Sequence, residues 1–302
     1  MPRRLIGNRV KRGSTEWINI VNPKKADFAI IVQEMQLSEE HVNTIMTKNH
    51  RSRLFESDDY ILMVLIQPTY NKERNDVVLK EVDVILTSKT VMTIQMDNLP
   101  SIQSLFGVVE STKSHKIMKH PASIVSGIMH ELVTELYETL DLLANELDHI
   151  EKRVIDDRKV LSEVLAMQTN IIDFQKALEN QNIMLERLLL SVSKQTAKFL
   201  QFQFHDLKLH IDEINASLHM EQMTAETLHR THETALNERT NSQIRILTAL
   251  SLIVLPATLL AGIFGMNINF PIIVGLPGDF WIILGIMLGA GLTIHYFAKS
   301  QR

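Results

Sequence analysis

The chain has 302 residues, enough for two domains, and 31 basic residues stand against 35 acidic ones. This balance gives no reason to expect a nucleic-acid partner, and the absence of cysteine excludes disulfides, thiolate metal sites and cysteine nucleophiles. No HExxH, GxSxG or phosphate-binding GxxxxGK motif occurs. We therefore expect a protein that is not an enzyme and needs no cofactor.

Residues 1–120 predict a small α/β domain. The basic segment 1–13 has no apolar core behind it, so we expect a mobile tail and not a secretory signal. Strand-like runs follow at 16–20, 60–66 and 77–95, the last divided by a turn at Ser88 and Lys89. Residues 38–48 predict a helix, with Ser38 placed to cap it.

Residues 121–245 predict a stalk of two or three long helices. Apolar residues recur there at three- and four-residue steps, as in Leu136, Leu140, Leu143, Leu147 and Ile150. The last of these helices should run without a break through Arg245 into a lipid bilayer. A solvated coiled coil would show the same pattern over most of this region.

Two apolar segments close the chain and predict two transmembrane helices, at 246–267 and 280–298. A loop at 268–279 joins them, and 299–302 form a tail. Basic residues lie before the first helix, at Arg239 and Arg245, and after the second, at Lys299 and Arg302, but not in the loop between the helices. Both termini should therefore be cytoplasmic. Gly285 and Gly289 in the second helix are spaced as a helix-packing signal.

The first transmembrane helix has one face that is small and polar but uncharged. Successive residues of a helix are turned by 100° about its axis, and the residues of this face fall within an arc of about 120° around that axis. Ile244 and Leu255 lie within the same arc. The members are Asn241, Thr248, Ser251, Thr258, Gly262 and Gly265. Such a face fits tight helix packing, or a pore lined by several copies around an axis. We favour the pore, because polar residues inside a membrane are functional by default.

The helix should end near Gly265, in the run Gly265-Met266-Asn267. A ring of Asn267 amides at the outer mouth would offer carbonyl oxygens without fixed charge. These oxygens suit a cation that keeps its water shell, and Mg2+ is such a cation. Asn267 can also serve as an ordinary helix C-cap, and the two roles can coexist.

These features resemble the CorA family of divalent-cation channels. The family signature Gly-Met-Asn stands at 265–267, after the similar lead-in "NERTNSQIRILTALSLIVLPATLLAGIFGMN", and "DYILMVLIQPTYNK" resembles a family strand. The resemblance implies a homopentameric funnel with a cytosolic αβα domain, a long-helix stalk and two transmembrane helices in a prokaryotic-type plasma membrane. It further implies that Asn267 binds the ion through water, that Asn241, Leu247 and Thr258 line the pore, and that Ile244 and Leu247 form a hydrophobic gate.

One departure from the family concerns regulation. The family pairs an acid on the N-terminal domain with one on the stalk as a magnesium sensor, and the matching positions here are Thr44 and Arg230. Glu39, Glu40 and Glu233 lie nearby but out of register. We therefore expect weak inhibition by cytosolic magnesium.

Two acid–histidine pairs stand four residues apart on the stalk, Asp206 with His210 and His229 with Glu233. Each pair shares one helix face and could hold a metal ion together, or could be an ordinary solvated pair. The first also matches a family Asp-x-x-x-His pattern.

The function predicted is a channel for hydrated Mg2+, also passing Co2+ or Ni2+, driven by the membrane potential. Its partners would be further copies of itself, the bilayer and the cations. The alternatives are a Zn2+-transporting relative and a non-conducting coiled-coil scaffold anchored in the membrane. The physiological ion and the direction of flux stay open.

Overall fold

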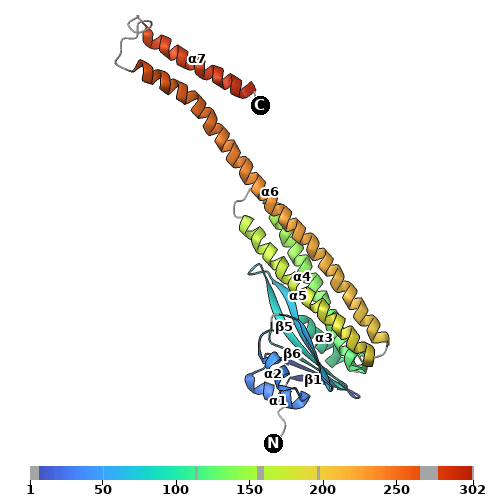
Figure 1. Cartoon of the computed structure of the whole chain (residues 1–302). Coiled ribbons are helices and arrows are strands. Elements are labelled where there is room, and N and C mark those ends of the chain that lie inside the picture. The colour runs from blue at the N-terminus through green and yellow to red at the C-terminus, as the bar shows by residue number, and fades with distance from the viewer. Residues whose placement is uncertain are drawn as a thin grey trace. The chain divides into compact units, whose positions relative to one another are not determined.

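The computed structural model describes residues 7–49, 51–112, 115–154, 160–195, 198–265 and 278–300. The chain divides into two compact units, Met1–His229 and Arg230–Arg302, and each is described by itself. The first contains a mixed β-sheet with helices on both faces (Figure 1). The second contains two helices.

The sheet has six strands in the order β1-β2-β6-β5-β4-β3. They are β1 (Asn8–Arg12), β2 (Thr15–Val21), β3 (Arg53–Glu56), β4 (Tyr60–Asn71), β5 (Asp76–Thr87) and β6 (Thr90–Gln95). Neighbours are antiparallel except β2 and β6, which are parallel with Glu16 opposite Thr90. The strands predicted from 16–20, 60–66 and 77–95 are confirmed, as is the turn at Ser88 and Lys89.

The N-terminal segment corrects one expectation, since residues 8–12 form an edge strand and not a mobile tail. Asn8 pairs opposite Asn19 of β2, and Arg9 forms an ion pair of 2.6 Å with Glu34. An edge strand can keep basic side chains solvated, which is why the charge pattern misled us. Gly7, at φ +70°, lies so close to β2 that a Cβ would stand 2.5 Å from the carbonyl oxygen of Asn19.

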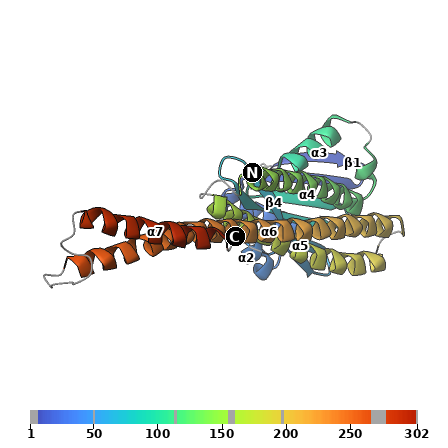
Figure 2. The same ribbon diagram turned by 90° about the horizontal axis from the view of Figure 1, so that it is seen from above.

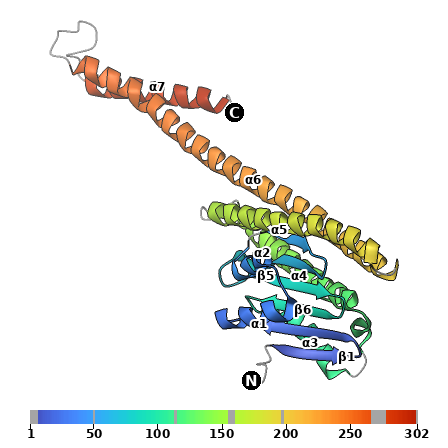
Figure 3. The ribbon, with the colours of Figure 1, turned by 60° about the horizontal axis from the view of Figure 1, so that its bottom comes forward.

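Helices cover both faces of the sheet, as Figure 3 shows. Helices α1 (Lys25–Met35) and α2 (Glu39–Met46) close one face, over Leu62 and Ile85. Helix α3 (Pro100–Ser111), a short 3-10 turn η1 (Lys116–Lys119) and α4 (Pro121–Glu151) close the other, over Met63 and Val84. Alternate strand residues thus enter opposite cores, which gives the αβα layers expected. Ser38 caps α2 as predicted, since its Oγ accepts a hydrogen bond of 3.4 Å from the His41 N–H.

Three long helices follow the sheet: α4, α5 (Val160–Gln195) and α6 (Lys198–Phe264). The predicted stripe on α4 is buried at all five positions from Leu136 to Ile150. Helix α6 runs unbroken past Arg245, as the sequence predicts. The division of the chain into a domain, a stalk and membrane segments stays a prediction.

Polar side chains fasten α5 to the β4–β5 hairpin. The Gln181 amide donates a 2.6 Å hydrogen bond to the Ile66 carbonyl. Asn170 accepts one of 3.0 Å from the Val77 N–H and donates one of 2.8 Å to the Asn75 carbonyl. Because these bonds satisfy strand groups, α5 is held in register with the hairpin.

The second unit contains the end of α6 and α7 (Asp279–Ser300), which lie side by side in Figure 2. A Cβ on Gly291 would stand 3.6 Å from Ile253, so the helices approach closely there. Gly285 and Gly289, the predicted packing pair, have no described neighbour within 4 Å. Within this single chain, Gly291 makes the close approach instead.

Candidate ion pathway along helix α6

The C-terminal part of α6 exposes an apolar surface that water alone would not favour. An 18-residue window of this helix has a mean hydropathy of 2.3, and none of it is buried inside the chain. Leu247, Leu255 and Leu259 are each more than 60% exposed. An apolar surface of this size marks a membrane or protein contact. Among the described residues α6 alone is long and apolar enough to span a bilayer, whereas the apolar stretch on α7, Phe280–Gly289, is shorter.

Two of the hydroxyls predicted to line a pore donate their hydrogen atoms within α6. Ser251 donates to the Leu247 carbonyl at 2.9 Å, and Thr258 donates to the Val254 carbonyl at 2.8 Å. A hydroxyl that donates within its own helix keeps its oxygen lone pairs for an outside donor. This face of α6 therefore offers acceptors to water or to the water shell of a cation.

The polar face predicted on α6 extends toward the N-terminal end of this helix as a stripe whose members alternate in steps of three and four residues. Its members are Arg230, Thr234, Asn237, Asn241, Ile244, Thr248, Ser251, Leu255, Thr258, Gly262 and Gly265. All are exposed apart from the half-buried Ser251. Such spacing averages 3.5 residues per turn, the period that keeps one face toward a shared axis in a left-handed helical bundle. Leu247 lies beside the stripe, and Arg230 is the stripe's one charged member.

Gly265 follows the last helical residue, as predicted for the end of this helix. Its N–H donates a 2.9 Å hydrogen bond to the Ala261 carbonyl. A Cβ at this position would stand 2.9 Å from that same oxygen, so a side chain would force the backbone to shift. Met266 and Asn267 lie outside the described residues, and their roles stay predictions.

The predicted cytosolic metal pairs do not assemble into a larger cluster. On α6 the Asp206 Oδ2 lies 3.8 Å from the His210 Nε2. His210 also lies 3.1 Å from the Tyr137 hydroxyl, which donates a 2.7 Å hydrogen bond to Glu213. Burial and that bond to Glu213 raise the pKa of Tyr137 to about 12. Within the described ranges no three such histidine or carboxylate groups could hold a metal ion together.

Tyr137 and Glu213 are not among the residues predicted from the sequence for this group. Glu213 could have been found, because it follows His210 by three residues and so shares its helix face. Tyr137 could not, because it comes from α4.

Within the part of the chain that the structure describes, the residues considered for magnesium sensing also belong to no cluster of three metal-ligating groups. Glu39 and Glu40 lie in the first turn of α2 and are exposed. The Thr44 hydroxyl donates a 3.1 Å hydrogen bond to the Glu40 carbonyl, so it is used within α2. On α6, His229 and Glu233 stand one turn apart, and Arg230 is exposed.

A buried carboxyl pair lies on the sheet face that α1 and α2 cover. Glu81 accepts two hydrogen bonds from Asn49, of 2.6 and 2.8 Å. Asp83 is fully buried, and neither of its carboxyl oxygens has a hydrogen-bond partner among the described residues. Burial, and then the negative charge of Glu81, raise the pKa of Asp83 well above its ordinary value. Neither Glu81 nor Asp83 is among the residues predicted from the sequence to form a site.

Comparison with known proteins decides the family. Residues 12–299 match the family described as CorA-like Mg2+ transporter protein. The chain belongs to this family. The family consists of ion transporters and not enzymes, and the divalent cation is cargo, so no resident cofactor is required.

Individual relatives agree over nearly the whole chain. The cobalt/magnesium transport protein CorA of Methanocaldococcus jannaschii is 21% identical over 94% of this chain and 90% of its own length. The complete structure of CorA from that organism matches with a TM-score of 0.85 at 18% identity, covering 97% of this chain and 92% of the other. The cytoplasmic domain of ZntB from Vibrio parahaemolyticus matches with a TM-score of 0.62 at 14% identity. This match covers 74% of this chain and 88% of the other. The α/β domain with long helices is thus the CorA fold.

Proposed function

We propose that this chain forms a homopentameric channel for hydrated divalent cations, with Mg2+ as the main ion and Co2+ and Ni2+ also passing. The observation that carries the proposal is the exposed stripe on α6, uncharged from Thr234 to Gly265 and regular in its spacing. Parallel copies of α6 would bring these stripes to one axis, and the number five comes from the family resemblance. Close packing between helices would explain the glycines of the stripe, but it would not explain why hydroxyl residues occupy the same face of α6.

The chemistry of the stripe suits an ion that moves with its water. Mg2+ gives up its water reluctantly, so a pore that strips it would bind it too tightly or exclude it. A ring of Asn267 carbonyl oxygens would accept hydrogen bonds from the bound water at the outer mouth. The Thr258 and Ser251 oxygens would do so further along, as neutral acceptors that hold the ion weakly enough to release it.

A gate would lie at the cytosolic end of the pore. Ile244 and Leu247 are 54% and 64% exposed in the single chain, so they are available to meet their counterparts around an axis. A narrow ring of such side chains closes a pore by excluding water, without a moving plug.

The membrane potential would drive entry. The free energy of a divalent cation falls by about 4.6 kcal/mol for each 100 mV of inside-negative potential when it moves inward, because each charge contributes about 2.3 kcal/mol. This presumes that both termini are cytoplasmic and that 268–279 face outside, in a prokaryotic-type plasma membrane.

Growth rescue tests the proposal. A bacterial host that lacks its own magnesium uptake systems should grow in low-magnesium medium when it produces this chain, and an empty vector should not support growth. Folded protein in the membrane without rescue would contradict the magnesium assignment. Zn2+ uptake by such a strain would then favour the zinc-transporting alternative, and no uptake of any divalent cation would favour the scaffold.

A further inference from the structure

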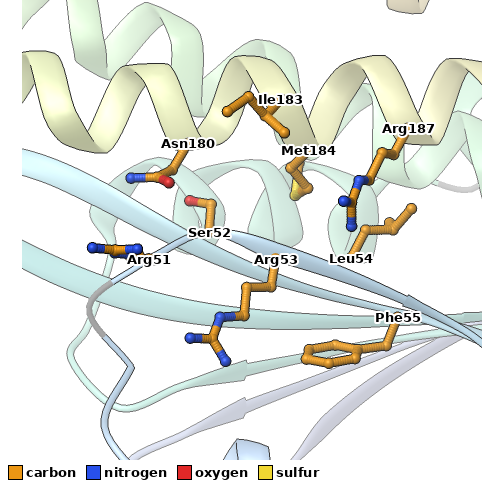
Figure 4. A pocket seen from close by; sticks show the side chains of 9 residues that line it. All are labelled: Arg51, Ser52, Arg53, Leu54, Phe55, Asn180, Ile183, Met184 and Arg187. Atoms are coloured by element: carbon orange, nitrogen blue, oxygen red, sulfur yellow. The ribbon is translucent and has the colours of Figure 1, made fainter.

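A pocket of about 290 Å3 opens in the first unit between the edge strand β3 and helix α5. One wall comes from residues 51–55. The other comes from Asn180, Ile183, Met184 and Arg187, which follow one another at the spacing of a single helix face. Figure 4 shows Arg187 reaching down from α5 toward Leu54, with Arg51 and Arg53 on the strand side. Strand and helix therefore enclose one shared space.

The charge of this pocket is entirely positive. Arg51, Arg53 and Arg187 line it, and its lining includes no acidic residue among those the structure describes. The ion pairs found among the described residues do not include any of these three arginines. Arg51 precedes β3 and Arg53 is its first residue, so two of the three arginines lie at the start of this strand. Like charges gathered around one pocket repel each other, and an anion bound among them would relieve this repulsion.

The floor beneath these arginines is preformed. Ser52, Leu54 and Met184 are buried at 7%, 8% and 1% exposure. The Ser52 hydroxyl accepts a 3.0 Å hydrogen bond from the Ile66 N–H, which ties the floor to β4. The three arginines are exposed at the rim. A buried floor with exposed cations around it can receive an anion from solution without repacking of the floor.

We propose that this pocket binds a small anion with two or more adjacent phosphate groups, such as a nucleoside diphosphate, a nucleoside triphosphate or pyrophosphate. A guanidinium group matches phosphate oxygens with two parallel hydrogen bonds, which an ammonium group cannot reproduce. The volume lies at the lower end of the range for small-molecule sites, and one phosphate would fill only part of it. Adjacent phosphates provide the charge and the span to meet arginines from both walls.

Titration calorimetry on the full-length protein in detergent, with a metal chelator present, tests the site. The probes are pyrophosphate, ADP, AMP and inorganic phosphate. Pyrophosphate and ADP should bind at least about tenfold more tightly than AMP and inorganic phosphate, the gain expected from one further charge-assisted contact. Equal affinity for pyrophosphate and ADP would show that phosphates alone are recognised, and tighter ADP binding would show a contribution from the nucleoside. No binding, or equal binding of all four probes, would overturn the proposal.

Two variants locate the site. Arg187→Gln and Arg53→Gln should each weaken pyrophosphate binding about tenfold. Arg74→Gln, at an exposed position in the β4–β5 turn, should leave it unchanged. Thermal unfolding shows which variants fold, and Arg51→Gln replaces any that does not. Wild-type affinity in the folded pocket variants would overturn the assignment. Because the readout is binding, the result is independent of whether the protein conducts Mg2+.

Discussion

The Thr258 hydroxyl donates a 2.8 Å hydrogen bond to the Val254 carbonyl, one turn earlier on α6. On α7 the Thr293 hydroxyl donates to the Gly289 carbonyl at 2.7 Å, in the same arrangement. The two threonines are therefore a matched pair in local chemistry, and only Thr258 belongs to the stripe proposed to line the pore.

Thr258→Val should lower Mg2+ flux about tenfold, because it removes an acceptor for ion-bound water at each of several copies. Thr293→Val should leave the flux close to that of the wild type. The measurement is Mg2+ uptake into vesicles, normalised to the amount of assembled protein. Equal flux in the two variants would remove Thr258 from the pathway.

Gly265→Ala should impair transport, because a Cβ there would stand 2.9 Å from a backbone oxygen that cannot move freely. The end of α6 would shift, and with it the proposed Asn267 ring. Gly285→Ala on α7 is the control, since a Cβ there would have no described atom within 4 Å apart from its chain neighbours and the nearby backbone of its own helix. Full transport by Gly265→Ala, at normal expression, would show that the helix end tolerates the shift.

The buried Asp83 predicts a pH dependence of stability. Its pKa is raised in the folded protein, so above the ordinary value of 3.8 the unfolded chain loses this proton while the folded chain keeps it. Asp83 therefore disfavours folding increasingly as pH rises from about 4 toward the raised pKa. Asp83→Asn should raise the unfolding temperature at pH 7 to 8, with a smaller difference from the wild type near pH 4. A difference that does not change with pH would contradict a protonated Asp83.

Much of the fold could be predicted because its patterns are local. Period-2 runs marked β4, β5 and β6, and the stripe from Leu136 to Ile150 marked α4. The edge strand β1 escaped notice because its charged side chains remain partly solvated. The α6 stripe could be read from spacing alone, since one helix carries it.

The basic pocket and the Tyr137 contact could not be read from the sequence. Arg53 and Arg187 lie 134 positions apart along the chain, and only the packing of α5 on the sheet edge brings them together. Asp83, which has no hydrogen-bond partner among the described residues, could have been predicted to be buried, because alternation along β5 puts it on the same face as the buried Ile85.

Regulation by magnesium should be weak, because Thr44 and Arg230 stand where relatives are expected to carry sensing acids. Cytosolic Mg2+ in the millimolar range should neither close the pore sharply nor protect α6 from proteolysis. Flux from liposomes at rising internal Mg2+ measures this. A steep decline in flux would show that other acids, such as Glu39, Glu40 and Glu233, have taken over the sensing role.

The most direct test of the channel is Mg2+ entry into liposomes under an imposed inside-negative potential, comparing wild type with Asn267→Ala. Wild-type protein should carry Mg2+ inward, faster as the potential grows. Asn267→Ala should assemble normally and carry almost none, because alanine can end a helix but cannot accept hydrogen bonds from the ion's water. Wild-type flux through Asn267→Ala, or no flux through the wild type, would contradict the account.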